Sequence, residues 1–196
     1  MLERQFSTTG QAVGWAKFAR GKLGGKGVLL DTNILSLILE SNKLDGWLRK
    51  TASHSQIATC RLNLLEHISS SVIIMDTEHD EIIAGLKAKG VHTIDGPCQS
   101  ADSTSLACRV LREEFEHQAV EGHVVGWRGK MKQSRVDLAF ACEGHTKGFA
   151  FVTADANFQA HFAHGLQNEG ITTYVVPAGW LRASMVGSPA PYIASK

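Results

Sequence analysis

Short apolar runs alternate with longer amphipathic stretches between residues 28 and 176. The apolar runs end at glycines or polar turn residues, which is typical of strands buried on both faces by helices. We therefore predict strands at 28–30, 56–59, 91–94, 149–153 and 172–176. Between them, apolar residues recur every three or four positions, which predicts helices at 32–40, 44–50, 62–68, 78–89, 103–116, 136–143 and 157–164. The stretch 72–75 fits either a strand or the end of a helix.

This alternation predicts an α/β fold, a three-layer α/β/α sandwich with a mostly parallel central sheet and right-handed crossovers. Residues 1–27 precede it as a helical extension with a glycine-rich linker, and residues 181–196 follow as an irregular tail. The main domain is expected at 28–180. The linker lacks the G-x-x-x-x-G-K-[ST] spacing of a phosphate-binding P-loop.

The composition of the chain mainly excludes classes of protein. Hydrophobic residues make up 43% of the chain and charged residues 20%, which argues against a fully disordered protein. The net charge of +1 provides no chain-wide attraction to nucleic acid, so any such attraction must be local. The four cysteines form no C-x-x-C pair, so we expect reduced thiols in a cytoplasmic protein. No apolar run approaches the ~20 residues that span a bilayer, so no membrane partner is expected.

Two acidic residues follow predicted strands directly. Asp31 comes immediately after the strand at 28–30, and Asp155 lies two residues beyond the strand at 149–153. Ligands of parallel α/β sheets bind at the carboxyl ends of the strands, where both acids are expected. The ordinary alternative is that each aspartate only caps the helix that follows it.

Four segments in order carry a family resemblance. They are Leu-Leu-Asp-Thr-Asn-Ile-Leu at 29–35, Leu-Asn-Leu-Leu-Glu at 62–66, Val-Asp-Leu-Ala-Phe-Ala-Cys at 136–142 and Phe-Val-Thr-Ala-Asp-Ala-Asn-Phe at 151–158. Together they resemble the motifs of PIN-domain nucleases. The resemblance implies a PIN-like fold in which Asp31, Glu66, Asp137 and Asp155 are the catalytic, metal-ligating acids. It also implies supporting roles for Asn33, Thr153 and Asn157, while Asp76 and Glu78 are rivals of Glu66 for the second acid.

Such a group of carboxylates suits a hard divalent cation. Mg²⁺ and Mn²⁺ prefer oxygen ligands, activate bound water and neutralise charge on a phosphate under attack. The resemblance thus implies a Mg²⁺- or Mn²⁺-dependent endoribonuclease similar to the VapC-like toxins of toxin–antitoxin pairs. The partners that it implies are an RNA substrate, an antitoxin protein and a second copy of the chain.

A basic segment precedes Asp137. It contains Arg128, Lys130, Lys132 and Arg135 beside Trp127, and no acidic residue lies between 121 and 137. We expect a loop whose cations clamp an RNA backbone while Trp127 stacks on an unpaired base. The alternative is a solvated loop without a ligand.

Two other functions compete with a nuclease. A PIN-like module that binds RNA or protein without cutting would be expected if the second acid is absent. A phosphatase of the haloacid dehalogenase type needs D-x-D-x-[TV] after the first strand, but Asn33 stands where the second aspartate is required. His161 and His164 lack an H-E-x-x-H pattern, so we expect packing roles for both.

Overall fold

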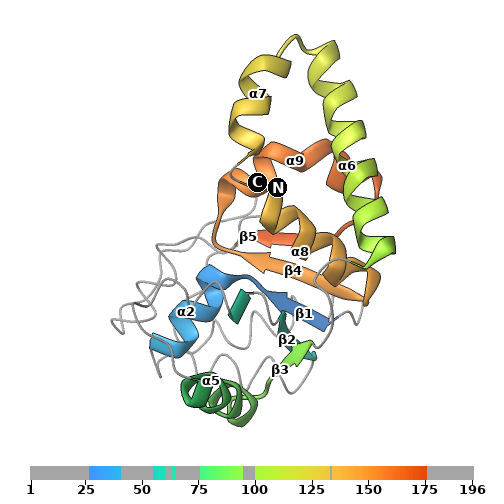
Figure 1. Cartoon of the computed structure of the whole chain (residues 1–196). Coiled ribbons are helices and arrows are strands. Elements are labelled where there is room, and N and C mark those ends of the chain that lie inside the picture. The colour runs from blue at the N-terminus through green and yellow to red at the C-terminus, as the bar shows by residue number, and fades with distance from the viewer. Residues whose placement is uncertain are drawn as a thin grey trace, which may run out of the picture.

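The computed structural model describes residues 27–40, 55–60, 63–64, 76–94, 100–132 and 134–175. The expected extension, the helix at 44–50, most of the helix at 62–68, the stretch 72–75 and the tail lie outside these residues. The described part contains a five-stranded parallel sheet in the order β3-β2-β1-β4-β5 (Figure 1). Its strands are β1 (Gly27–Leu30), β2 (Ile57–Cys60), β3 (Val91–Ile94), β4 (Phe149–Thr153) and β5 (Thr173–Val175).

Six helices are described, and they cover both faces of the sheet. They are α2 (Thr32–Glu40), α5 (Asp76–Ala88), α6 (Ala101–Val120), α7 (Val124–Met131), α8 (Arg135–Thr146) and α9 (Ala156–Asn168). Alternate residues of each buried strand point to opposite faces. Val28 and Leu30 therefore pack with α2 and α5, whereas Leu29 packs with α6, α8 and α9. The predicted α/β architecture with a parallel sheet is confirmed.

Most element boundaries agree with the sequence pattern. The strands at 91–94 and 149–153 are as predicted, and α5 is followed by Gly90, whose positive φ of 82° suits a glycine. Helix α6 begins two residues before the predicted 103–116, because the hydroxyl of Ser100 caps its first turn, and it continues beyond the predicted end to Val120. None of the described helices is both long and apolar enough to cross a membrane.

The strand order reverses direction between β1 and β4. From β1 the chain moves outward through β2 to β3, and it then returns to β4 on the other side of β1 and continues to β5. β1 pairs in parallel with both β2 and β4, and Leu30 lies opposite Val152. In sheets of this kind a crevice for ligands opens outside the carboxyl ends at such a reversal. Here that position lies directly after Leu30 and Thr153.

The C-terminal part of α6, together with α7, forms an arm that extends away from the sheet at the top of Figure 1. This corrects one prediction, since residues 124–131 are helical and not a loop. The sequence does not predict this helix, because it contains two glycines and has only a weak apolar periodicity. It is fixed by Trp127, which is only 7% exposed and donates from Nε1 to the carbonyl oxygen of His161 in α9 over 2.8 Å.

Candidate active site at the carboxyl edge of the sheet

Asp31 lies at the carboxyl end of β1 with its side chain buried, at 2% exposure. Its Oδ1 accepts from the backbone N–H of Thr32 at 2.7 Å, and its carbonyl oxygen accepts from the next turn of α2. The residue therefore caps α2, as the ordinary alternative expected. Its Oδ2, however, accepts from two side chains, which a simple cap does not require.

Those two donors come from different segments. The hydroxyl of Thr153, the last residue of β4, donates to Asp31 Oδ2 at 2.6 Å, and Asn33 Nδ2 donates to the same oxygen at 2.7 Å. Asn33 also reaches across to β4, where its Oδ1 accepts from the backbone N–H of Ala154 at 2.9 Å. The ends of β1 and β4 are thus joined by side chains at the point where the strand order reverses.

Asp155 belongs to the same network through its backbone. Its N–H donates to Thr153 Oγ1 at 2.9 Å, so a single hydroxyl contacts both the carboxylate of Asp31 and the main chain of Asp155. Asp155 is half-buried, and its Oδ1 caps α9 by accepting from the Asn157 N–H at 2.8 Å. The side chain of Asn157 is exposed.

Glu66, the expected second acid, lies outside the described residues, and so does the side chain of its rival Asp76. The structure does describe Asn63, which the sequence analysis had not singled out. Asn63 is fully buried, and its Nδ2 donates to the carbonyl oxygen of Leu30 at 2.9 Å. A fully buried asparagine bonded to the end of β1 places Asn63 at the same edge of the sheet.

Asp137 is half-buried in the first turn of α8. Because α8 leads through a tight turn into β4 and packs along it, its first turn lies toward the carboxyl end of that strand. Within the described ranges, no three Asp, Glu, His or Cys side chains form a group that could hold a metal ion. Asp31, Asp137 and Asp155, which are all described, therefore do not form such a group by themselves.

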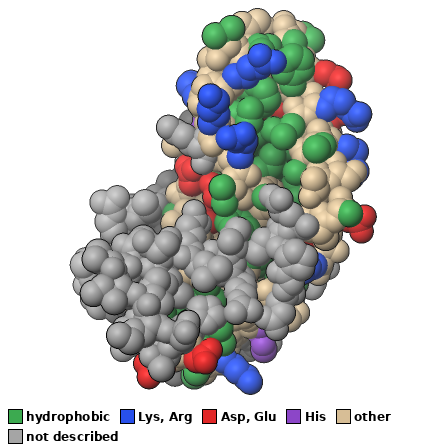
Figure 2. Space-filling model, viewed as in Figure 1, with side chains coloured by type: hydrophobic (Ala, Val, Ile, Leu, Met, Phe, Trp, Pro, Cys, Tyr) green, Lys and Arg blue, Asp and Glu red, His purple; other side chains and the backbone are tan. Residues whose placement is uncertain are grey.

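The basic segment lies on α7 and the start of α8. Arg128, Lys130, Lys132 and Arg135 are all exposed, and the guanidinium of Arg128 lies 5.4 Å from the ring centre of Phe115. Figure 2 shows Lys and Arg side chains gathered over this end of the molecule, with acidic side chains below them on the same face. Trp127 differs from these cations, because its indole is largely buried and bonded to α9.

The chain was also compared with known proteins. No protein-family model and no curated protein sequence matches it.

Proposed function

We propose that the protein is a metal-dependent endoribonuclease with a PIN-like fold, and that its active site is the carboxyl edge between β1 and β4. One observation supports this most strongly. The hydroxyl of Thr153 joins the buried carboxylate of Asp31 to the backbone of Asp155 where the strand order reverses. Asp31 and Thr153 are 122 positions apart in sequence, so the contact depends on the fold and not on local turn geometry.

The donors at this edge suit a hard cation. Mg²⁺ keeps several waters and is commonly bound through one or two carboxylates, the remaining positions being filled by water or phosphate. Asp31 and Asp155 would hold it, with Glu66 and Asp137 as the further ligands that the resemblance implies. A bound Mg²⁺ or Mn²⁺ would activate water and neutralise charge on the scissile phosphate.

The surrounding side chains give the carboxylate of Asp31 a fixed direction. Asn33 and Thr153 both donate to its Oδ2, and Asn33 is itself fixed by Ala154 N–H. Partners of this kind orient ligand carboxylates, and their loss typically reduces metal affinity or activity by about 10- to 100-fold. We assign Asn33 and Thr153 this positioning role.

The wider biology of the proposal follows the family resemblance. A VapC-like toxin would act in the cytoplasm, would be inhibited by an antitoxin protein and would work as a homodimer. The substrate would be RNA, cut to products with 5′-phosphate and 3′-hydroxyl ends.

Cleavage of a labelled single-stranded RNA with and without Mn²⁺ tests the proposal. We expect Mn²⁺-dependent cleavage by the wild type and at least about a 100-fold loss in Asp31→Asn. Asp102→Asn is the matched control, since Asp102 is exposed in the first turn of α6. Equal rates for Asp31→Asn and the wild type would remove the assignment.

A binding module without nuclease activity is the second candidate. It is favoured by the exposed cations on α7 and at the start of α8, Arg128, Lys130, Lys132 and Arg135, which could hold an RNA backbone without any metal. RNA binding by the wild type without cleavage at millimolar Mn²⁺ would favour this module over the nuclease.

A further inference from the structure

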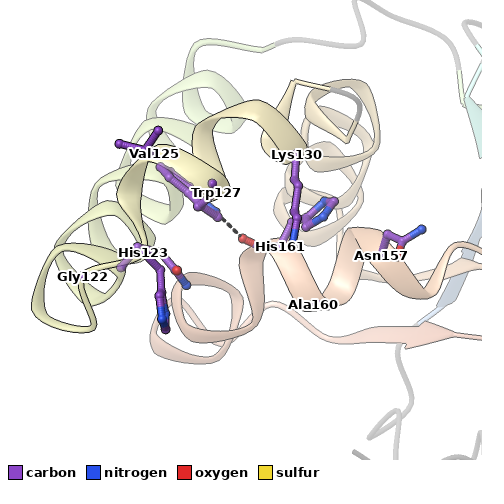
Figure 3. A pocket seen from close by; sticks show the side chains of 10 residues that line it. Gly122, His123, Val125, Trp127, Lys130, Asn157, Ala160 and His161 are labelled. Carbon is purple, nitrogen blue, oxygen red and sulfur yellow. Dashed lines mark hydrogen bonds between the residues drawn. The ribbon is translucent and has the colours of Figure 1, made fainter.

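An open cleft of about 780 Å³ lies between the arm and α9 (Figure 3). One wall is formed by the end of α6 and by α7, with Gln118, His123, Trp127 and Lys130. The other wall is formed by α9, with Asn157 and His161. In the close-up, the side chain of Lys130 extends from α7 toward α9, the helix that carries His161.

The chemistry of this cleft favours an anion. None of its 10 lining residues is an aspartate or a glutamate, whereas a lysine, two histidines and two side-chain amides carry nitrogen atoms that can donate hydrogen bonds. Two of these groups already have a partner in the protein, since Gln118 Nε2 donates to Glu114 Oε1 at 2.9 Å and His161 Nδ1 is paired with Ser134 Oγ at 3.0 Å. The exposed cations Arg128 and Lys132 lie on the same helix or just after it. A positively charged groove of this kind follows a sugar–phosphate backbone without reading its sequence.

The cleft also ends beside the candidate active site. Asn157, at one end of the lining, donates its backbone N–H to Asp155 Oδ1 at 2.8 Å. Because Asn157 is only two residues from Asp155, a ligand at this end of the cleft would lie within one helical turn of Asp155. In this arrangement, the cations that would attract phosphate lie in the groove. The acids that would hold a metal ion lie at the edge of the sheet.

We propose that this cleft, with Lys130 as its main phosphate contact, binds the backbone of single-stranded RNA and directs it to the edge between β1 and β4. The inference rests on the proposed nuclease function but concerns binding alone. It assigns new positions, His123, Gln118 and His161, to the RNA path. It also replaces the expected stacking of a base on Trp127 by contact of the RNA backbone with the groove, one wall of which contains Trp127.

Binding can be measured without cleavage by fluorescence anisotropy of a labelled oligouridine in EDTA. We expect Lys130→Gln to weaken binding about three- to fivefold, as for loss of one exposed charge pair. The slope of log Kd against log salt should fall by about 0.7, the value for one phosphate contact on a single strand. Lys87→Gln is the matched control, because Lys87 is exposed on α5 against the opposite face of the sheet.

A second measurement locates the RNA on the surface. Val125 and Val120 are 89% and 86% exposed, but only Val125 lines the cleft. We expect oligouridine to slow alkylation of the thiol in Val125→Cys severalfold and to leave that in Val120→Cys unchanged, as read by peptide mass spectrometry. The exposed native Cys108 provides an internal reference.

The outcomes separate the two proposals. Absence of RNA binding by the wild type, equal affinities for Lys130→Gln and Lys87→Gln, or equal protection of both thiols would overturn the groove, whatever the cleavage assay shows. If the affinity and alkylation experiments both give the expected results but the protein shows no Mn²⁺-dependent cleavage, RNA binding by the groove would be supported and the nuclease proposal would be wrong.

Discussion

Two buried carboxylates, Asp31 and Glu114, have nearly the same exposure but different surroundings. Glu114 of α6 is 1% exposed, and its Oε2 accepts from the backbone N–H groups of His164 and Gly165, each at 3.0 Å. Those amides follow Phe162, whose φ of −131° breaks the regular geometry of α9. Glu114 of α6 thus caps the part of α9 that follows the break at Phe162.

The break in α9 also fixes the arm. In a regular helix the Gly165 N–H would donate to the carbonyl oxygen of His161. Here the Gly165 N–H donates to Glu114, and the His161 oxygen accepts from Trp127 Nε1. Gly165 is required at this point, because a Cβ there would lie 2.4 Å from the carbonyl oxygen of Val110.

The comparison distinguishes a structural acid from a candidate functional one. Glu114 accepts from two backbone amides of α9 at Oε2 and from the side chain of Gln118, four residues further along α6, at Oε1 over 2.9 Å. Its partners therefore hold α6 against the break in α9. Asp31 accepts at Oδ2 from two side chains, Thr153 and Asn33, at a sheet edge where ligands bind. Changes at Glu114 should therefore reduce stability, and changes around Asp31 should reduce activity more than stability.

The largest loss of stability is expected for Glu114→Ala. It leaves two backbone amide groups at the break in α9, and the side-chain amide of Gln118, without their acceptor. We expect the free energy of unfolding to fall by about 3 kcal/mol, measured by urea denaturation. A loss below about 0.5 kcal/mol would show that α9 does not depend on this cap.

Thr153→Val tests the surroundings of Asp31, the candidate functional acid. Valine has a similar shape but neither donates to Asp31 Oδ2 nor accepts from the Asp155 N–H. We expect RNA cleavage to fall about 10- to 100-fold and the free energy of unfolding by only about 1–2 kcal/mol. Thr153→Ser keeps the hydroxyl and should retain most of the activity. Equal activities for the valine and serine variants would contradict the positioning role.

A smaller, pH-dependent effect is expected at Glu143, a third buried carboxylate. Burial raises its pKa, but hydrogen bonds from Ser103, Lys147 and Ser100 outweigh this and keep the pKa below its ordinary value of 4.5. A carboxyl whose pKa is lowered by folding stabilises the protein above its unfolded pKa, and this stability is lost as the pH falls through the folded value. The Tm of Glu143→Gln should therefore fall less steeply than that of the wild type below about pH 4.5. Parallel curves would show that Glu143 does not contribute.

The sequence predicted the sheet and part of the candidate site for a definite reason. Buried parallel strands are continuous apolar runs, so the end of each run places the following residue at the carboxyl edge. This is how Asp31, Thr153 and Asp155 could be placed before the structure. The Thr153 hydroxyl contacts the carboxylate of Asp31 and the backbone N–H of Asp155, which agrees with that placement, whereas the roles of Asp31, Glu66, Asp137 and Asp155 in a metal site stay predictions.

The features that the sequence did not predict depend on distant contacts. Glu114 lies within an amphipathic helix, and its burial follows from a break at Phe162 in another helix. Helix α7 contains Gly126 and Gly129, which lower helix propensity, so its stability depends on the docking of Trp127 on α9. Neither contact has a local signal in the chain.

Calorimetric titration with Mn²⁺ tests the central claim most directly, because it needs neither the RNA target nor a partner protein. We expect binding by the wild type and by Asp102→Asn at the same affinity, and binding at least about tenfold weaker by Asp31→Asn. A wild type that takes up no Mn²⁺ at millimolar concentration, or an Asp31→Asn variant that binds it as the wild type does, would contradict a metal site at the edge between β1 and β4.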